Sequence, residues 1–564
     1  MRITRHFVTV GTRRVHYLRA GNGPALALLH ASPCSAKVMR PLLPVFGERF
    51  TCLAFDTPGF GLSDKLPDPA PDIEDFADAL AATLDALGVE QVATYGRHTG
   101  ASIGVEFAAR YPQRCAMALA DGYAAFPARW TESQLERYLE PIVPSWDGAH
   151  LLRLWFRYRD QHVFFPWNAQ TEEHRSDGDV PDPDFLHRGV VELLEAGNDY
   201  RIGYAAPFRH RGLGVLADLK VPVCFGYRPG DSLYASRTLF PPSAWTEVMP
   251  RELRLAALAE RAILERTILE GKPARGVPPA GHSAPHPAHG APPAAPACTA
   301  LPGRTTTDYL TVDGAQVLVR SAGDLKSAAP LLVLHHAPGS SLLYDALILE
   351  SAPALALDFP GHGESDPLPG NPQDVGIWAD TAAKVLAQLG IREVRVYGHN
   401  GGAAVAVELA RRLGRRVLGL ALDAPCFLGE AERATLPARY APEVLPVWEG
   451  SHWLRAWHHL RDSELWWPWF DRTHGAARRG DLHIDPADLT LRVREAMKQP
   501  ASYAPAWRAA LEYPGREHRA GIEAPVFEMA AGPDEFAPHA PGMKTADDLR
   551  SRAQAIRRWI GETS

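Results

Sequence analysis

The sequence predicts an α/β protein made of two tandem copies of one domain, each with a mostly parallel sheet flanked by helices. Two observations lead to this fold class. In both halves, short aliphatic runs alternate with amphipathic helical stretches, and the same motifs return in the second half at a constant distance. A stretch rich in proline, alanine and glycine separates the two halves.

The strands of the first half are expected in five short apolar runs: "ALALLH", "FTCLAFD", "QVATYG", "CAMALAD" and "VPVCFGY". Between two of them, residues 73–88 carry the apolar period of a helix and end at a glycine. Strands that are apolar along their whole length are typical of a parallel sheet covered by helices on both faces. The alternation of strand and helix points to the same arrangement.

The repeat is defined by its constant spacing. "LAFDTPGFGLSD" at 53–64 matches "LALDFPGHGESD" at 355–366, and a longer match joins 138–160 to 440–462. The same spacing of 302 positions separates Asp56 from Asp358 and Trp146 from Trp448 within these matches, and His98 from Asn400 and Asp121 from Asp423 outside them. We therefore interpret the two halves as one duplicated domain.

Composition excludes several classes of function. The net charge of −7 and the lack of a basic block argue against nucleic acid. The six cysteines are scattered without a CxxC pair, which fits a reducing compartment and predicts no metal cluster. The polar first residues and the absence of a long apolar run predict neither a signal peptide nor a membrane span. We expect a cytoplasmic protein with no cofactor, metal, nucleic acid or membrane partner.

One turn is built twice. "YGRHTG" at 95–100 and "YGHNG" at 397–401 place small residues around a central one, as where a strand turns sharply into a helix. Such a turn pushes the central side chain into a pocket above the helix N-terminus, where backbone N–H groups gather. The central residues are His98 and Asn400. An imidazole accepts a proton, whereas a carboxamide is no useful nucleophile.

Four motifs in the same order carry a resemblance in each half. They are "LLHASP" (28–33), "DTPGFGLSD" (56–64), "YGRHTG" and "VPVCFGYRPGD" (221–231), with counterparts "LHHAPG" (334–339), "DFPGHGESD" (358–366), "YGHNG" and "APVFEMAAGPD" (524–534). Each half resembles the α/β-hydrolase fold, in the branch of epoxide hydrolases, haloalkane dehalogenases and carbon–carbon bond hydrolases. In that family the turn is the nucleophile elbow and holds Ser, Cys or Asp, which both copies replace.

The resemblance also implies the remaining parts of a site. It places the acid at Asp231 and Asp534, and an alternative acid at Asp121 and Asp423; strand-end capping is the other interpretation of that second pair. It assigns the second oxyanion donor to the N–H of Ser32. Our alignment pairs Ser32 with Pro338, which has no N–H, so copy two is expected to lose this donor.

The usual catalytic histidine, which should follow one more strand, is missing in both copies. In copy one that strand is expected at 244–250, but Arg251 and Glu252 come after it, and His282 lies in the linker. In copy two too little chain remains after Asp534 for the strand, and His539 is the only histidine left. We expect His98 to fill the vacant space, pair with Asp231 or Asp121 and act as a general base. The alternative is that His98 only fills a closed pocket.

Tryptophans gather where the family has its helical cap. "PSWDGAHLLRLWFRYRDQHVFFPW" and "PVWEGSHWLRAWHHLRDSELWWPW" share their aromatic and polar pattern, which predicts a rigid apolar roof over a pocket. For Trp155 and Trp457 we favour the alternative, a place in the helical core. The expected domains are 1–271 (cap about 125–205), a linker at 272–303, and 304–564 (cap about 427–510), the second copy being degenerate.

The sequence predicts an α/β-hydrolase-like enzyme that uses serine-free His/Asp chemistry on a small aromatic or alicyclic molecule. Copy one is expected to be catalytic and copy two to support it; a homo-oligomer is left open. The alternatives are an inactive binding or scaffold protein, and activity in both pockets. The candidate catalytic residues are His98, Asp231 and Asp121; the oxyanion or binding residues are Ser32, Thr99, Arg97, His30, Trp146, Asp147, His150 and Trp167; and the second-copy pocket residues are Asn400, His399, Asp534 and Asp423.

Overall fold

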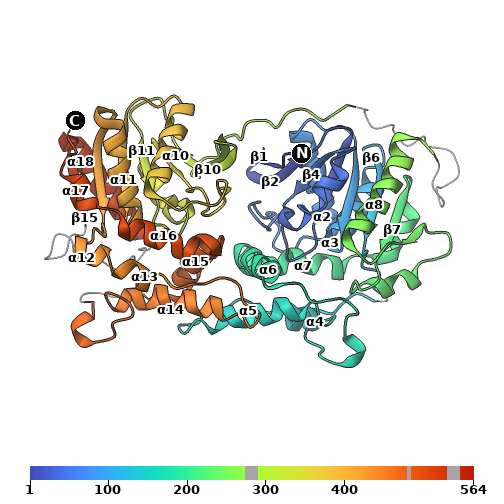
Figure 1. Ribbon diagram of the computed structural model, residues 1–564. Coiled ribbons are helices and arrows are strands. Elements are labelled where there is room, and N and C mark those ends of the chain that lie inside the picture. The colour runs from blue at the N-terminus through green and yellow to red at the C-terminus, as the bar shows by residue number, and fades with distance from the viewer. Residues whose placement is uncertain (127, 273–289, 479–483, 530–545, 564) are drawn as a thin grey trace. The chain divides into compact units, whose positions relative to one another are not determined.

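The computed structural model describes residues 1–126, 128–272, 290–478, 484–529 and 546–563 (Figure 1). The chain divides into two compact units, and each contains one sheet. Unit 1 holds Met1–Ile142 and Leu154–Thr299, and unit 2 holds Val143–Arg153 and Ala300–Ser564. Two tandem α/β domains are therefore confirmed. The expected boundaries kept residues 143–153 with the first domain, whereas here they belong to unit 2.

The sheet of unit 1 has the strand order β1-β2-β4-β3-β5-β6-β7-β8. The strands from β4 to β8 run parallel to their neighbours, as expected. The strands β1 and β2 form an antiparallel hairpin that also joins β4 antiparallel, which the alternation of strand and helix did not predict. The strands are β1 Thr4–Val10, β2 Arg13–Ala20, β3 Ala25–Leu29, β4 Thr51–Phe55, β5 Val92–Arg97, β6 Cys115–Asp121, β7 Val223–Tyr227 and β8 Thr246–Val248.

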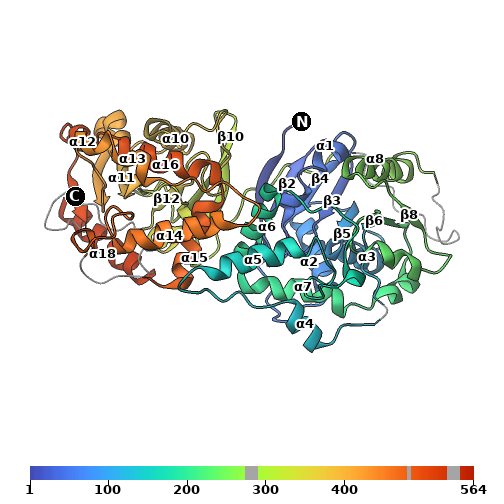
Figure 2. The ribbon, with the colours of Figure 1, turned by 60° about the horizontal axis from the view of Figure 1, so that its bottom comes forward.

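Helices cover both faces of this sheet (Figure 2). Alternate residues of β3 explain why: Ala27 and Leu29 join one core with α2 and α3, whereas Leu26 and Leu28 join another with α1 and α8. The helices α4–α7 lie in the expected cap region. The helices are α1 Leu43–Phe46, α2 Ile73–Ala86, α3 Thr99–Arg110, α4 Glu132–Tyr138, α5 Ala149–Asp160, α6 Pro183–Ala196, α7 Tyr200–Arg209 and α8 Leu253–Leu264.

The sheet of unit 2 repeats this topology. Its order, β9-β10-β12-β11-β13-β14-β15, equals that of the first sheet without β8. The described part of unit 2 contains no counterpart of β8; residues 530–545 lie outside the described residues, so the expected loss of that strand after Asp534 stays a prediction. The strands are β9 Thr306–Val312, β10 Ala315–Ala322, β11 Leu331–Leu334, β12 Ala354–Leu357, β13 Val394–His399, β14 Val417–Asp423 and β15 Val526–Met529.

The core of unit 2 is likewise split by its sheet. On one face Trp378 of α10 is fully buried and stacks on Phe359, with ring centroids 5.3 Å apart. On the other face α9 and α18 pack on the strands. The helices are α9 Asp345–Glu350, α10 Val375–Gln388, α11 Gly401–Leu413, α12 Glu430–Arg433, α13 Leu436–Tyr440, α14 Ser451–Leu465, α15 Pro486–Met497, α16 Pro500–Glu512, α17 Gly515–Arg519 and α18 Ala546–Thr563.

The expected linker and the surface complete the description. Residues 273–289, which include His282, His286 and His289, lie outside the described residues, and 290–303 form neither helix nor strand.

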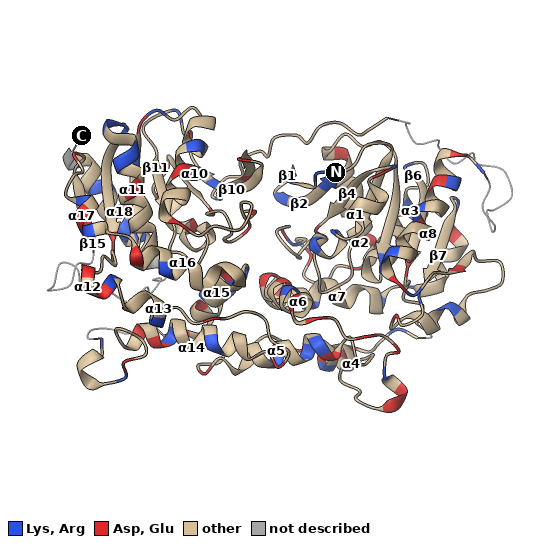
Figure 3. Cartoon of the chain, viewed as in Figure 1, with Lys and Arg blue, Asp and Glu red and all other residues tan. Residues whose placement is uncertain are grey.

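Acidic and basic residues are interspersed along the helices of each unit (Figure 3). Among the helices described, none has both the length and the apolar character that crossing a bilayer requires.

Trp378→Ala tests the importance of the second core. Removing a fully buried indole should lower the free energy of unfolding of unit 2 by about 3–5 kcal/mol, because a cavity replaces its contacts. Trp448→Ala, at a side chain that is 48% exposed, is the control and should change stability by less than about 0.5 kcal/mol. Urea unfolding of both variants checks this, and equal effects would show that the buried stack is unimportant.

Candidate functional site

The elbow at the end of β5 is built as the glycine pattern predicts. His98 has φ 48° and ψ −109° and precedes the first residue of α3, Thr99. A Cβ atom on Gly96 would lie 2.1 Å from the carbonyl oxygen of Gly100, and one on Gly100 equally close to that of Leu29. Only glycine fits these two positions, so the chain turns sharply and directs the His98 side chain into a cavity.

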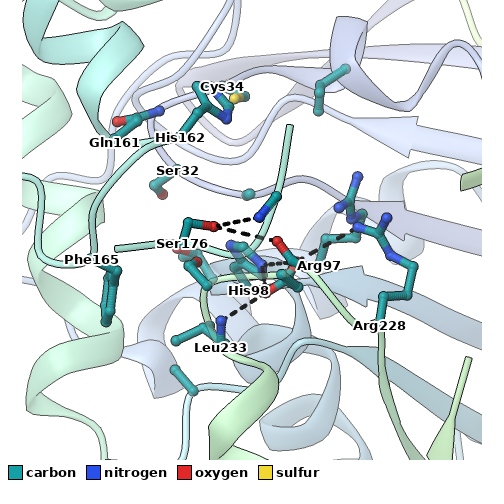
Figure 4. Close-up of a pocket in the computed structure, with 18 of the residues that line it drawn as sticks. Ser32, Cys34, Arg97, His98, Gln161, His162, Phe165, Ser176, Arg228 and Leu233 are labelled. Carbon is teal, nitrogen blue, oxygen red and sulfur yellow. Dashed lines mark hydrogen bonds and ion pairs between the residues drawn. The ribbon is translucent and has the colours of Figure 1, made fainter. Parts of the chain in front are cut away.

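The His98 ring is paired with a carboxylate from the loop after β7. Its Nε2 lies 2.9 Å from Oδ2 and 3.0 Å from Oδ1 of Asp231, which also accepts a hydrogen bond from the N–H of Leu233 at 2.9 Å (Figure 4). The Nε2–H group therefore donates to Asp231, and Nδ1 is left as the proton acceptor. The Asp231 side chain is buried, while that of His98 is 28% exposed.

The charge on Asp231 is stabilised where it lies. Burial opposes ionisation, but attraction to His98, the hydrogen bond with His98 and the nearby Arg97 outweigh it, and the pKa of Asp231 lies well below its ordinary value. Arg228 Nη2 also lies 3.6 Å from Oδ2. Asp231 is thus a carboxylate that can stabilise a positive charge on the imidazole.

Asp121, the other expected partner, does not contact the His98 ring. Its carboxylate pairs with Arg97 Nε at 3.0 Å and accepts a hydrogen bond from the Tyr95 hydroxyl at 3.3 Å, while its backbone oxygen accepts from the N–H of His98. Asp121 therefore holds Arg97, which lines the cavity, and does not hold the imidazole of His98. Of the two alternatives left open by the sequence, the structure selects Asp231.

A third carboxyl group, that of Glu260, interacts with Asp121 and the two arginines Arg97 and Arg228. Glu260 of α8 is buried, and burial together with repulsion from Asp121 raises the pKa of Glu260 to about 8. The same site therefore contains one strongly acidic carboxyl group and one that is protonated at neutral pH. Sequence reasoning missed Glu260, although it shares an apolar helical stripe with Ala256, Ala257 and Leu264.

A cavity of about 400 Å³ extends from the elbow beneath the cap. Ser32, Arg97 and Thr99 line it together with His98 and Asp231. Aromatic rings form much of the remaining wall: Phe126, Tyr138, Tyr158, Phe165, Phe185, Tyr204 and Phe208. The arrangement suits a small, largely apolar molecule.

His30 and Asp147 lie outside the cavity lining. His30 is buried, its Nδ1 donates to the Ala31 oxygen, and its Nε2 accepts from the N–H of Thr57, so it holds the loop after β3. Asp147 caps the following turn through the N–H of Ala149. His150 belongs to unit 2, where its Nε2 lies 2.9 Å from the hydroxyl of Thr490. The prediction that these three residues border the pocket of copy one is wrong in this structure.

The tryptophans of the cap likewise serve its structure. Trp167 Nε1 donates to the Tyr138 oxygen at 2.9 Å and is not part of the cavity wall. Trp146 is 68% exposed. Trp155 and Trp457 are fully buried among the helices, as the core alternative expects. The aromatic pattern shared by the two repeats therefore predicted where the cap lies, but it did not predict which cap residues face the cavity.

The second elbow has the same backbone and different surroundings. Asn400 has φ 49° and ψ −112° and is buried. His399 Nδ1 lies 2.8 Å from the Tyr344 hydroxyl, and Asp423 pairs with Arg552. Asp534 lies outside the described residues.

The structure corrects our alignment of the loop after the first parallel strand. His335 Nε2 accepts from the N–H of Phe359 as His30 does from Thr57, which makes Ala337 the counterpart of Ser32. Because Ala337 has an N–H, the second repeat does not lose that donor through Pro338. What differs is the preceding residue, His336, whose Nδ1 faces the N–H of Gly401 at 3.4 Å and whose ring packs on Trp507.

Four further residues of the first site were missed. Arg228, Gln161 and His162 line the cavity, and Glu260 lies below it. Arg228 stands inside the "YRPGD" motif, three residues before Asp231, and Gln161 and His162 follow the Arg-Asp pair of the cap. Their positions were visible in the sequence, but nothing in one sequence distinguishes a cavity-lining polar residue from a solvated one.

Gly122→Ala tests whether the His98–Asp231 pair needs its backbone neighbour. A Cβ atom at Gly122 would lie 2.7 Å from His98 Cδ2, and Gly122 has φ +67°, so we expect the ring to leave Asp231 and stability to fall by about 1–3 kcal/mol. Imidazole ¹⁵N and ¹H NMR should show loss of the hydrogen-bonded Nε2–H signal. The matched control is Ala424→Gly in the second repeat; an unchanged signal in Gly122→Ala would contradict the packing argument.

Glu260→Gln tests the raised pKa. In the unfolded chain a glutamate ionises near pH 4.3, whereas folded Glu260 stays protonated up to about pH 8, so wild-type stability should fall as pH rises between these values. Glutamine removes this loss, and the variant should gain roughly 5 kcal/mol over wild type at pH 8.5 but almost nothing at pH 4. Thermal unfolding across pH measures the difference. The exposed Glu90→Gln is the control, and a pH-independent effect of Glu260→Gln would refute the raised pKa.

Comparisons with known proteins agree with this architecture. A family model of the alpha/beta hydrolase fold matches residues 24–197 and 329–449. The chain is 34% identical over 113 residues to a cis-3-alkyl-4-alkyloxetan-2-one decarboxylase of Shewanella oneidensis, over 20% of this chain and 36% of that protein. It is 32% identical over 111 residues to a 2-(acetamidomethylene)succinate hydrolase of Mesorhizobium japonicum, over 19% of this chain and 40% of that protein.

These two matches cover well under half of each relative's own length. A crystal structure of E-2-(acetamidomethylene)succinate hydrolase aligns with 48% of this chain and 100% of its own, at 17% identity and a TM-score of 0.36. The family model, in contrast, covers more than half of the chain in two segments, one in each repeat, and the chain belongs to the alpha/beta hydrolase fold family.

Proposed function

We propose that the first repeat is a serine-free hydrolase or lyase in which His98 is the general base and Asp231 orients and stabilises it. The substrate is a small aromatic or alicyclic molecule, and the reaction is hydrolysis or cleavage of a C–C or C–O bond. The observation that carries the proposal is the 2.9 Å contact of His98 Nε2 with Asp231 at an elbow that faces a cavity. The relatives described above are enzymes of this superfamily, which supports an enzymatic role.

The tautomer defines the chemical step. Since Nε2–H donates to Asp231, Nδ1 takes the proton from a water molecule or from an acidic C–H or O–H group of the substrate. With water as the nucleophile, one O–H bond breaks: its proton passes to Nδ1, and its electron pair forms the new bond from oxygen to a carbonyl carbon of the substrate, whose C=O π electrons move onto the carbonyl oxygen. When the C=O bond re-forms, the C–C or C–O bond to the leaving group breaks, and the leaving group takes the proton from Nδ1. The imidazolium that forms in between lies beside a carboxylate whose pKa is lowered, so its charge is balanced within the site.

The negative charge that develops on the substrate needs donors. The elbow places Thr99 at the first turn of α3, and Ser32 borders the same cavity. By the geometry of the fold, their backbone N–H groups form the oxyanion hole of the proposed site. Aromatic walls exclude water around it, which strengthens these interactions.

The second repeat fits a supporting role. At its elbow Asn400 replaces the base, and His336 and Trp507 fill the space beside Gly401. The alternative function, a binding or scaffold protein without turnover, fits this repeat better than the first, because only the elbow of the first carries a histidine paired with a carboxylate.

Turnover tests the proposal. Wild type, His98→Ala, His98→Ser and Asn400→Ala are compared on a panel of aromatic epoxides, esters and β-diketones. We expect His98→Ala and His98→Ser to lose about 10²–10⁴-fold in kcat, since serine restores a hydroxyl but not the base that would activate it.

Asn400→Ala is the matched control, because it changes the same position of the other elbow, and it should keep activity within about threefold. Circular dichroism confirms that each variant is folded. Full activity in His98→Ala, or a hundredfold loss in Asn400→Ala, would refute the assignment of the base. Absence of turnover on every member of the panel by the wild type, together with tight binding of one, would favour the binding-protein alternative.

A further inference from the structure

Polar atoms without a protein partner gather on one wall of the first cavity. Among the described residues, Ser32 Oγ, Gln161 Oε1 and His162 Nε2 are buried and make no hydrogen bond, and all three residues line the cavity. Figure 4 shows Gln161 and His162 on the side away from Leu233, with His98 between. A ligand that supplies matching hydrogen-bonding groups to these atoms is therefore favoured over one that leaves them unpaired.

The two cap residues of this wall are held in place. Gln161 and His162 directly follow α5, and their N–H groups donate to the backbone oxygens of Arg157 and Arg159. The His162 ring meets Tyr158 and Phe185 edge-on, with centroids 5.4 and 5.6 Å away. Because this packing fixes the ring, its Nε2 is a rigid part of the wall.

The wall is uncharged at neutral pH. Burial, reinforced by the positive charges of His98 and Arg97, lowers the pKa of His162 to about 4. Glutamine and serine carry no charge. These groups are therefore suited to hydrogen bonds with an uncharged ligand group.

The arginines of the cavity are already neutralised. Arg97 pairs with Asp121 at 3.0 Å, and Arg228 lies 3.6 Å from both Asp121 and Asp231. Arg251 pairs with Asp177 at 3.0 Å. A substrate carboxylate would have to compete with these aspartates, and a buried charge without a partner is expensive.

The second repeat closes the equivalent positions. At the same spacing of 302, Ser463 replaces Gln161 and Glu464 replaces His162. Ser463 Oγ donates to the His459 oxygen at 2.7 Å, and Glu464 Oε1 pairs with Arg492 at 2.6 Å. Unpaired polar atoms at these positions are thus not a requirement of the cap helix; they distinguish the first repeat from the second.

We propose that Gln161 and His162 recognise an uncharged amide group, N–H together with C=O, on a planar aromatic substrate. The N–H donates to Gln161 Oε1, and the carbonyl oxygen accepts from His162 Nε2–H. The inference rests on the proposed function for its assignment to a substrate, but the recognition site itself is testable without turnover.

Three probes of one shape test the proposal: 2-naphthamide, N,N-dimethyl-2-naphthamide and 2-naphthoate. Their dissociation constants for the full chain are measured by calorimetry at pH 7.5. We expect 2-naphthamide to bind at least about tenfold more tightly than either analogue, because one analogue lacks the donor and the other carries a charge. Equal binding of all three, or a preference for 2-naphthoate, would overturn the proposal.

Two variants test whether Gln161 and His162 cause the preference for 2-naphthamide. Gln161→Leu and His162→Phe keep the apolar packing but remove the polar atoms, and each should reduce the preference for 2-naphthamide to about threefold or less. Ser463→Ala, at the position equivalent to Gln161, is the control and should leave it unchanged. A preference that persists in both cavity variants would mean that other groups recognise the amide.

His98→Ala separates this inference from the proposed function. The recognition wall does not include the base, so His98→Ala should retain the preference for 2-naphthamide while losing any turnover. If His98→Ala lost the preference for 2-naphthamide while Gln161→Leu kept it, the amide would be recognised at the elbow and the proposal would be wrong. An inactive wild type with an intact preference would refute the catalytic proposal and leave this one standing.

Discussion

The sharp left-handed turn at His98 is the constraint on which the first site depends. Glycines at positions 96 and 100 allow strand β5 and helix α3 to meet so closely that only the central residue has room to project. Its position is therefore set by the backbone and not by its own chemistry. The same backbone holds Asn400 in the second repeat, which shows that the turn tolerates whichever side chain the surrounding groups accommodate.

Those surrounding groups differ between the repeats as a matched set. His98 stands over Gly122, where a Cβ atom would collide with the ring. The shorter Asn400 accompanies Ala424, which has a Cβ atom at the equivalent position and a positive φ of its own. His336 then occupies space beside the second elbow that the first repeat leaves open. Around each elbow the side chains thus differ as a set, with His98 beside a cavity in the first repeat and His336 facing Gly401 in the second.

Much of this followed from the sequence, for identifiable reasons. Period, repeat spacing and glycine placement predicted the sheets and the elbows, because backbone geometry restricts these positions most strongly. The β1–β2 hairpin was missed although Gly11 and Thr12 form a two-residue turn signal. Side-chain contacts were harder to predict. His150 and Trp167 belong to the aromatic and polar pattern of the cap, but neither lines the cavity, because packing decides which cap residues face it. Misalignment by one residue after β3 produced the error at Pro338.

The balance of charge around the elbow suits the role of base that we propose for His98. Arg97 and Arg228 face the carboxylates of Asp121 and Asp231. Glu260 stays protonated at neutral pH because it is buried and because a further negative charge beside Asp121 is unfavourable. The group is therefore close to neutral before any proton moves. A proton that arrives on His98 adds one positive charge next to Asp231, at the same moment as the substrate gains one negative charge. The two charges offset each other within a cavity lined by aromatic rings, where such an interaction is stronger than in water.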